Sequence, residues 1–113
     1  MKKQEFLNEI DIPKLVVKEG RTILYLKYND IKWFKTEGNY TTIFLKDNKK
    51  RISRVSLLEL NQYLPVQQFV RIHKSYIVNK MHVTEIRSNR ILIDDQELPI
   101  GRSYQQNVTA FLK

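Results

Sequence analysis

Residues 69–79 read Phe-Val-Arg-Ile-His-Lys-Ser-Tyr-Ile-Val-Asn, and this stretch decides the fold. It places Arg71, His73 and Lys74 within an otherwise apolar run of β-branched and aromatic residues. One buried strand would not hold these three groups so close together without partners, because an unpaired buried charge is costly. The pattern therefore predicts two strands separated by a short polar break over 73–75. We expect the break to present cations and hydrogen-bond donors to an anionic polymer.

The chain is strongly basic. It contains 20 lysine and arginine side chains against 12 aspartate and glutamate side chains, which gives a net charge of +8 and a pI near 9.8. A small domain with this charge is expected to bind an anionic partner. The candidates are nucleic acid, a membrane surface and an acidic protein. Residues 46–54 concentrate five of the cations with a single acid. Such a run is equally typical of a solvated hairpin tip, so by itself it does not separate the two interpretations.

Length and composition indicate one folded domain. The 113 residues suffice for a single core, and 42% of them are apolar and 11% aromatic, which is typical of a folded protein. The chain has no cysteine, which excludes disulfides and thiolate metal sites and is in keeping with a cytoplasmic location. No apolar run approaches the roughly 18 residues of a membrane span, and residues 1–10 lack the apolar core of a signal peptide.

Short runs of strand-forming residues recur along the chain, separated by turn residues. Three glycines and three prolines are few, so most of the chain is expected in regular elements. Residues 1–13 have only weak helical periodicity and end at Pro13, so we expect an N-terminal arm or linker there and a single domain over 14–113. The strands predicted for this domain are 15–17, 21–26, 31–37, 40–45, 50–53, 69–72, 76–79, 83–87, 90–93 and 97–100.

One segment between the strands has helical spacing instead. Ser56 is a good N-cap residue, and Glu59 three positions later completes a capping box. Pro65 ends the segment. The apolar residues of the predicted core-facing stripe are Leu57, Leu60 and Leu64, with Leu58 and Tyr63 beside them. A second helix is predicted over 104–112. Its sheet-facing residues are Tyr104, Val108 and Phe111.

The sequence lacks the groups that enzymes require. Its histidines are His73 and His82, and without cysteine or an H-x-x-x-H spacing a zinc site is not expected. His73 and Ser75 would share a strand face, but no glycine-rich elbow surrounds them and no acid lies near to orient the histidine. No glycine-rich phosphate-binding motif is present, and Asp94 with Asp95 is better interpreted as a hairpin turn than as a metal pair. We therefore expect no enzymatic activity and no cofactor.

Three breaks between predicted strands carry groups suited to nucleic acid, which needs cations for phosphates and a few polar side chains for base edges. The first break offers the amide of Asn39, whose best bidentate partner is adenine. The second carries the cluster of residues 71–74, and the third carries Arg102. Each has an ordinary explanation by itself, since asparagine tolerates a turn and a cation is commonly solvated or paired with an acid. All three occur together in a chain of charge +8, which favours nucleic-acid binding.

The order of five segments in the chain is distinctive. They are residues 33–40 (Trp-Phe-Lys-Thr-Glu-Gly-Asn-Tyr), 54–57 (Arg-Val-Ser-Leu), 64–65 (Leu-Pro), 69–79, and 98–104 (Leu-Pro-Ile-Gly-Arg-Ser-Tyr). In this order they resemble the LytTR family, the DNA-binding output domain of many bacterial response regulators. The resemblance runs from about residue 15 to the C-terminus, and its most specific segment is 69–79.

The resemblance implies a mainly β fold, an elongated stack of small antiparallel sheets with about ten short strands and one or two short helices. It implies sequence-specific binding to double-stranded DNA for transcriptional regulation, in which loops rather than a recognition helix enter successive major grooves. Lys74 stands where the family often has arginine. Lysine keeps the positive charge but lacks the planar fork of the guanidinium group. The base contacts implied are Asn39, Lys74, Arg102 and Ser103. The phosphate contacts implied are Arg71, His73, Ser75, Lys50, Arg54 and Lys80.

The resemblance also carries expectations about partners. DNA targets of the family are commonly paired repeats, so two domains per site and a homodimer on DNA are expected, without membrane association. Family members usually carry a phosphorylatable receiver domain before this one. The residues of the predicted arm, 1–13, are too few for a receiver. The chain is therefore expected to be either a stand-alone regulator or a fragment of a longer one.

Two other functions stay open at this point. An RNA-binding β domain would also be basic, but it needs exposed aromatic side chains to stack unpaired bases, and we place both Tyr40 and Tyr76 in or near the core. A basic protein-interaction module would bind an acidic partner and would not bind DNA at physiological salt.

Overall fold

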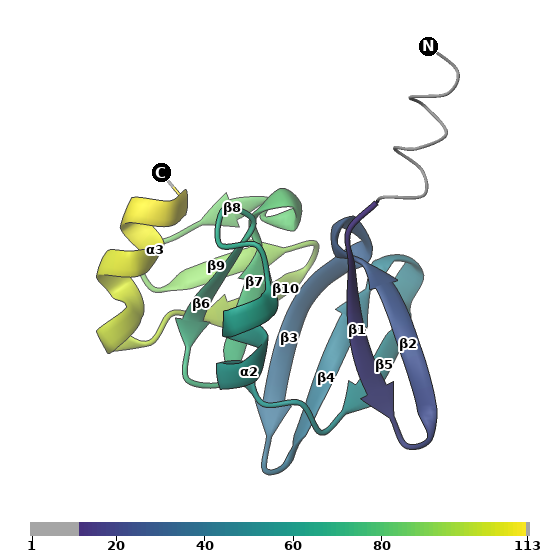
Figure 1. Cartoon of the computed structure of the whole chain (residues 1–113). Coiled ribbons are helices and arrows are strands. Elements are labelled where there is room, and N and C mark those ends of the chain that lie inside the picture. The colour runs from purple at the N-terminus through teal and green to yellow at the C-terminus, as the bar shows by residue number, and fades with distance from the viewer. Residues whose placement is uncertain (1–11, 113) are drawn as a thin grey trace.

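The computed structural model describes residues 12–112, and within them ten strands form three antiparallel sheets (Figure 1). The molecule measures 46 × 36 × 26 Å along its principal axes, and the predicted mainly β stack of small sheets is confirmed. The predicted arm over 1–13 lies outside the described residues, except for Ile12 and Pro13. In the part of the chain that is described, no helix is long and apolar enough to cross a membrane.

The largest sheet has five strands in the order β5-β4-β3-β7-β6. Its neighbouring strands are all antiparallel. The predicted meander over 31–53 forms one half of this sheet, and the two strands of residues 69–79 form the other half. The strands are β3 (Ile31–Glu37), β4 (Tyr40–Leu45), β5 (Lys50–Ser53), β6 (Phe69–His73) and β7 (Tyr76–Asn79).

Two smaller sheets accompany the five-stranded one. The first is a hairpin of β1 (Lys14–Glu19) and β2 (Thr22–Lys27), which confirms the hairpin predicted around Gly20. The second has the order β10-β9-β8. Its strands are β8 (Glu85–Ile86), β9 (Arg90–Ile93) and β10 (Gln96–Pro99).

Helix α2 (Leu57–Tyr63) begins at the predicted capping box. The Ser56 hydroxyl accepts a hydrogen bond of 3.1 Å from the Glu59 backbone N–H, and the Glu59 side chain returns to the N-cap. The buried stripe is Leu57, Leu60 and Leu64, as predicted. Leu58 and Tyr63 are instead 67% and 68% exposed. Their placement beside the stripe is wrong because α2 packs on the sheet through one face only.

Several strands begin or end one or two residues from the predicted bounds, and two further elements differ in other ways. The last helix begins with a 3-10 turn over Arg102–Tyr104, and α3 proper covers Gln105–Leu112. Strand β8 occupies only two residues of the predicted 83–87. The Val83 N–H instead closes a preceding 3-10 turn by donating to the Lys80 carbonyl oxygen at 3.1 Å, so the strand starts later.

The five-stranded sheet is buried on both faces, which creates two cores. Adjacent residues of β3 point to opposite faces, as strand geometry requires. Phe34 lies in the core shared with the β1–β2 hairpin and with Leu60 of α2. Trp33 lies in the core shared with the third sheet and with Val108 of α3. Strand β3 is apolar on both faces because other elements cover the sheet on both sides. Packing on both faces also holds the strand ends of this sheet in position.

Candidate nucleic-acid interface

The turn between β3 and β4 projects Asn39 into solvent. It consists of Gly38 and Asn39 and is closed by the pair Glu37 and Tyr40. Gly38 has a φ of 57°, a left-handed conformation that glycine adopts without strain and that two-residue hairpin turns favour. The Thr36 hydroxyl braces the turn by donating to the Tyr40 carbonyl oxygen at 3.2 Å. An exposed amide is therefore held on a short, well-defined turn.

The turn between β6 and β7 projects Lys74 into solvent. Arg71 holds this turn from within β6. Its guanidinium donates to the carbonyl oxygens of His73 at 3.3 Å and of Lys74 at 2.7 Å. The Ser75 backbone N–H donates to Nδ1 of His73 at 3.0 Å. Each residue of the polar break thus has a defined hydrogen-bonding role, while the ammonium of Lys74 stays free of protein partners within the described residues.

His73 is neutral in this arrangement. Burial lowers the pKa of its imidazole, and the nearby charges of Lys74 and Arg71 lower the pKa further. Because Nδ1 accepts the Ser75 N–H, the ring proton of the neutral form lies on Nε2. The imidazole is thereby a hydrogen-bond donor through Nε2 and does not depend on protonation to fulfil that role.

Backbone hydrogen bonds bring the three predicted breaks to one end of the five-stranded sheet. The Thr36 N–H donates to the Ser75 carbonyl oxygen at 2.9 Å, which joins the β3–β4 turn to the β6–β7 turn. The Gly101 N–H donates to the Ile72 carbonyl oxygen at 2.7 Å, which brings Arg102 beside the end of β6. In Figure 1 the β3–β4 and β6–β7 turns lie along the lower side of the molecule.

Tyr40 also lies at this end, and its predicted place in or near the core is wrong because its side chain is 48% exposed. Thr41 and Ile43 of the same strand are fully buried, and alternation along a strand turns Tyr40 outward. Nη2 of Arg54 donates to the Tyr40 hydroxyl at 3.1 Å, and the guanidinium carbon lies 5.3 Å from the ring centroid. Tyr76 is half-buried, which agrees with its predicted place near the core.

We call this end of the sheet the turn edge. Eight of the ten predicted site residues belong to it. Lys50 and Lys80 do not, because Lys50 pairs with Phe44 at the other end of β4 and Lys80 follows the far end of β7, with its ammonium 5.6 Å from the Phe111 ring. The residues of the turn edge are Asn39, Arg54, Arg71, His73, Lys74, Ser75, Arg102 and Ser103.

The cations of the turn edge lack carboxylate partners. Within residues 12–112, no salt bridge involves Arg54, Arg71, Lys74 or Arg102. Glu37, two positions before Asn39, pairs with Lys35 at 3.3 Å and is the main cause of the raised pKa of Lys35. Four positive charges that the protein does not neutralise give this edge a positive potential suited to an anion.

Sequence reasoning missed two aromatic residues of the turn edge. Tyr40 carries Arg54, as described above. The ring centroid of Tyr104 lies 5.8 Å from the guanidinium carbon of Arg71, so this ring links the 3-10 turn of Arg102 to the β6–β7 turn. Strand alternation from Ile43 would have placed Tyr40 outside, whereas no local signal pairs Tyr104 with Arg71, because they are far apart in the chain.

Fold and edge together define the class of protein: a small, mainly β domain whose turns carry uncompensated cations and polar side chains, an arrangement suited to an anionic partner. The family model described as the LytTr DNA-binding domain matches residues 21–113. The chain belongs to this family, which confirms the resemblance. It is accordingly a DNA-binding domain of the kind used in transcription regulation.

Relatives with known names agree with this assignment. The chain is 27% identical over 105 residues to the sensory transduction protein LytT of Bacillus subtilis, and 34% identical over 95 residues to the heme-containing CO-sensing transcriptional regulator RcoM 2 of Paraburkholderia xenovorans. These alignments cover 88% and 78% of this chain but only 43% and 35% of the relatives. The chain thus spans less than half the length of either protein.

A solved structure shares the fold. It is the LytTr DNA-binding domain of a methyl-accepting/DNA response regulator from Bacillus cereus. The two chains superimpose with a TM-score of 0.76 at 20% identity, over 88% of this chain and 95% of that one. The predicted fold class is confirmed by this likeness and by the three antiparallel sheets.

Proposed function

We propose that this chain binds double-stranded DNA sequence-specifically and that the turn edge reads the major groove. The supporting observation is that seven residues from three separate breaks, together with Arg54 after β5, converge on one end of the central sheet, with four cations that lack carboxylate partners. Entry of these turns into successive major grooves, which the family resemblance implies, is part of the same proposal.

The roles follow from the chemistry of each exposed group. The amide of Asn39 can donate to and accept from the same adenine edge, and Arg102 can donate two parallel hydrogen bonds to guanine. Lys74 supplies a point charge with rotatable donors, so its ammonium can donate to guanine O6 or N7 with less geometric restriction. Ser103 is a further base contact beside Arg102.

The phosphate contacts are assigned to the groups that flank these turns. Arg54 is exposed and stacks on Tyr40, which fixes its guanidinium for a bidentate phosphate contact. Nε2 of His73 and the hydroxyl of Ser75 add neutral donors. Arg71 uses Nε and Nη2 to hold the Lys74 turn, which leaves Nη1 for a phosphate. Lys50 and Lys80 stay outside the proposed interface.

Paired repeats and two domains per site belong to the same proposal, as does a place in the bacterial cytoplasm, where the DNA is. Titration of a duplex carrying two copies of the target sequence should saturate at two chains per duplex. The salt dependence of binding should be steep, because neutralising each phosphate releases counterions.

The test is selection of bound duplexes from a random pool with the full chain. The proposal expects one enriched sequence that binds about 10³-fold or more tighter than a scrambled duplex at physiological salt. A pool that stays random after repeated rounds, while the protein still binds DNA, would exclude sequence-specific reading.

RNA binding is the second candidate, and the exposure of Tyr40 favours it because stacking of unpaired bases needs exposed rings. Arg54 covers the ring of Tyr40, however, and its guanidinium bonds the hydroxyl, so a base would have to displace it. Competition between the selected duplex and single-stranded RNA of the same sequence separates the two functions. Binding to neither, with capture of an acidic protein, would point to the basic protein-interaction module.

A further inference from the structure

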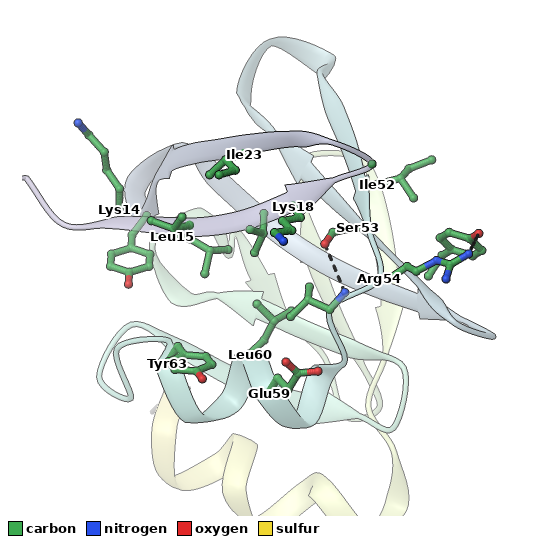
Figure 2. Close-up of a pocket in the computed structure, with 16 residues that line it drawn as sticks. Lys14, Leu15, Lys18, Ile23, Ile52, Ser53, Arg54, Glu59, Leu60 and Tyr63 are labelled. Carbon is green, nitrogen blue, oxygen red and sulfur yellow. Dashed lines mark hydrogen bonds between the residues drawn. The ribbon is translucent and has the colours of Figure 1, made fainter.

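A groove of about 1150 Å³ runs along strand β1, on the side away from β2. Figure 2 shows β1 with Leu15 and Lys18 on one side of it and Glu59, Leu60 and Tyr63 of α2 on the other, while the side chain of Lys14 points outward, away from α2. Residues 52–55, at the end of β5 and just after it, line one end of the groove. None of the base contacts proposed for the turn edge lines this groove, although Arg54 and Tyr40 border both the groove and the turn edge.

The wall formed by β1 is an unpaired strand edge. The pair Glu19 and Thr22 closes a two-residue hairpin turn, and in such a hairpin the hydrogen-bonded pairs alternate from the closing pair outward. The backbones of Leu15 and Val17 therefore bond β2, and those of Lys14, Val16 and Lys18 point the other way. No backbone hydrogen bond within residues 12–112 satisfies these three on the groove side. An exposed strand edge of this kind is a template for pairing with another strand.

The rest of the lining is apolar with a positive rim. The half-buried Val55 forms its floor, above the fully buried Leu60, and Val16 on its rim is 54% exposed. Lys14 and Lys18 lie toward the two ends of β1. The cations that line the groove are Lys14, Lys18 and Arg54, and the carboxylate that lines it is Glu59. The groove thus combines backbone donors and acceptors, an apolar floor and a positive charge, which together specify an extended segment with acidic and apolar side chains.

We propose that this groove binds an acidic, extended peptide segment of another protein, which adds to β1 as a strand. Main-chain hydrogen bonds to β1 supply affinity, and alternate side chains of the added strand reach the apolar floor and the lysines. The six residues of β1 offer an edge of about 20 Å. Charge complementarity decides the occupant, since carboxylates of the partner lie beside Lys14 and Lys18.

A second copy of this chain fits less well. Antiparallel pairing of two β1 strands about Val16 would set Lys14 of one copy opposite Lys18 of the other, and like charges directly opposite destabilise a strand pair. Pairing about Val17 covers an equal length of β1 and would set Lys18 of one copy diagonal to Lys18 of the other, so like charges meet in that register too. The inference concerns a protein contact and does not depend on the proposed reading of DNA.

The experiment uses the full chain and the blocked peptide Glu-Val-Glu-Val-Glu-Val-Glu as the probe. Saturable binding is expected, measured by NMR, with hydrogen exchange at the backbone amides of Lys14, Val16 and Lys18 slowed at least about tenfold, as new hydrogen bonds require. The same peptide with N-methylated amides should not bind, because it cannot pair. No binding by the first peptide, or equal binding by the N-methylated one, overturns strand addition.

Matched variants test the charge argument. Lys14→Glu and Lys18→Glu should each weaken peptide binding about tenfold, whereas Lys49→Glu, which makes the same charge change outside the groove, should not. Amides of Lys14, Val16 and Lys18 that are already protected in the full chain without peptide would show the edge to be covered by the chain itself or by a second copy. Dilution separates those two outcomes, and either one overturns the choice of a foreign acidic peptide.

Discussion

Nη2 of Arg71 donates a 2.7 Å hydrogen bond to the carbonyl oxygen of Lys74, so a cation inside strand β6 holds the turn that carries an exposed cation. The same guanidinium carbon lies 5.8 Å from the Tyr104 ring centroid. Arg71 therefore ties two of the three breaks of the turn edge together. These two contacts give Arg71 a role in positioning the turns, in addition to its role in attracting phosphate.

Arg71→Lys separates these two roles, because lysine keeps the charge but cannot donate both hydrogen bonds in the same geometry. We expect Arg71→Lys to lose affinity for the selected duplex nearly as much as Arg71→Ala, while it retains more binding to random DNA than Arg71→Ala. Fluorescence anisotropy with both duplexes measures this. If Arg71→Lys binds the selected duplex like the wild type, the positioning role is wrong.

Asn39→Ala and Arg102→Ala should each cost about 1–3 kcal/mol in binding the selected duplex and should relax the preference at one base position. The reason is that each side chain supplies base-edge hydrogen bonds that alanine lacks. Repeating the selection with each variant identifies the position. Asn61→Ala, an exposed asparagine of α2, is the control and should leave both affinity and preference unchanged.

The slope of log K against log salt should fall by about one for Lys74→Ala and for Arg54→Ala, because each removes one phosphate or DNA contact and its released counterion. Lys50→Ala and Lys80→Ala remove the same charge at the other end of the sheet, so their slopes should equal that of the wild type. A drop in slope for Lys50 or Lys80 would mean that DNA extends beyond the turn edge.

Stability should fall in mild acid because the pKa of His73 is lowered in the folded state. The unfolded chain then binds a proton near its ordinary pKa of 6.5 while the folded chain does not, so the free energy of unfolding is highest above that pH and decreases as pH falls through 6.5 toward the folded pKa. Urea unfolding at pH 7.5 and pH 5.5 measures the decrease. His73→Gln should make the decrease smaller.

Asn79 is fully buried, and its side chain bridges three backbone groups. Nδ2 donates to the carbonyl oxygens of Tyr28 at 3.1 Å and Ile31 at 2.8 Å, and Oδ1 accepts from the Met81 N–H at 2.9 Å. Asn79→Ala should lower the free energy of unfolding by roughly 2–5 kcal/mol, because each buried group left without a partner costs about 1–3 kcal/mol. Urea unfolding checks this, and a loss below that of Asn61→Ala would contradict it.

The sequence predicted the elements well because their signals are local. Alternation and turn residues gave the ten strands, and the Ser56–Glu59 capping box gave the start of α2. It also nominated the residues of all three breaks. Exposure was harder to predict, since Tyr40, Leu58 and Tyr63 have the same apolar character as their buried neighbours, and only the neighbouring elements decide which face is covered.

Residue order alone determined that this chain is a basic, mainly β domain with cations and amides at its turns, because periodicity and turn chemistry act over a few neighbouring residues. The tertiary structure decided which of those turns meet. The bonds from Thr36 to Ser75 and from Gly101 to Ile72 join segments about 30 to 40 positions apart, and they gather eight residues on one edge while Lys50 and Lys80 fall at the other end. Pairing between distant strands depends on the packing of two cores, which no local pattern encodes.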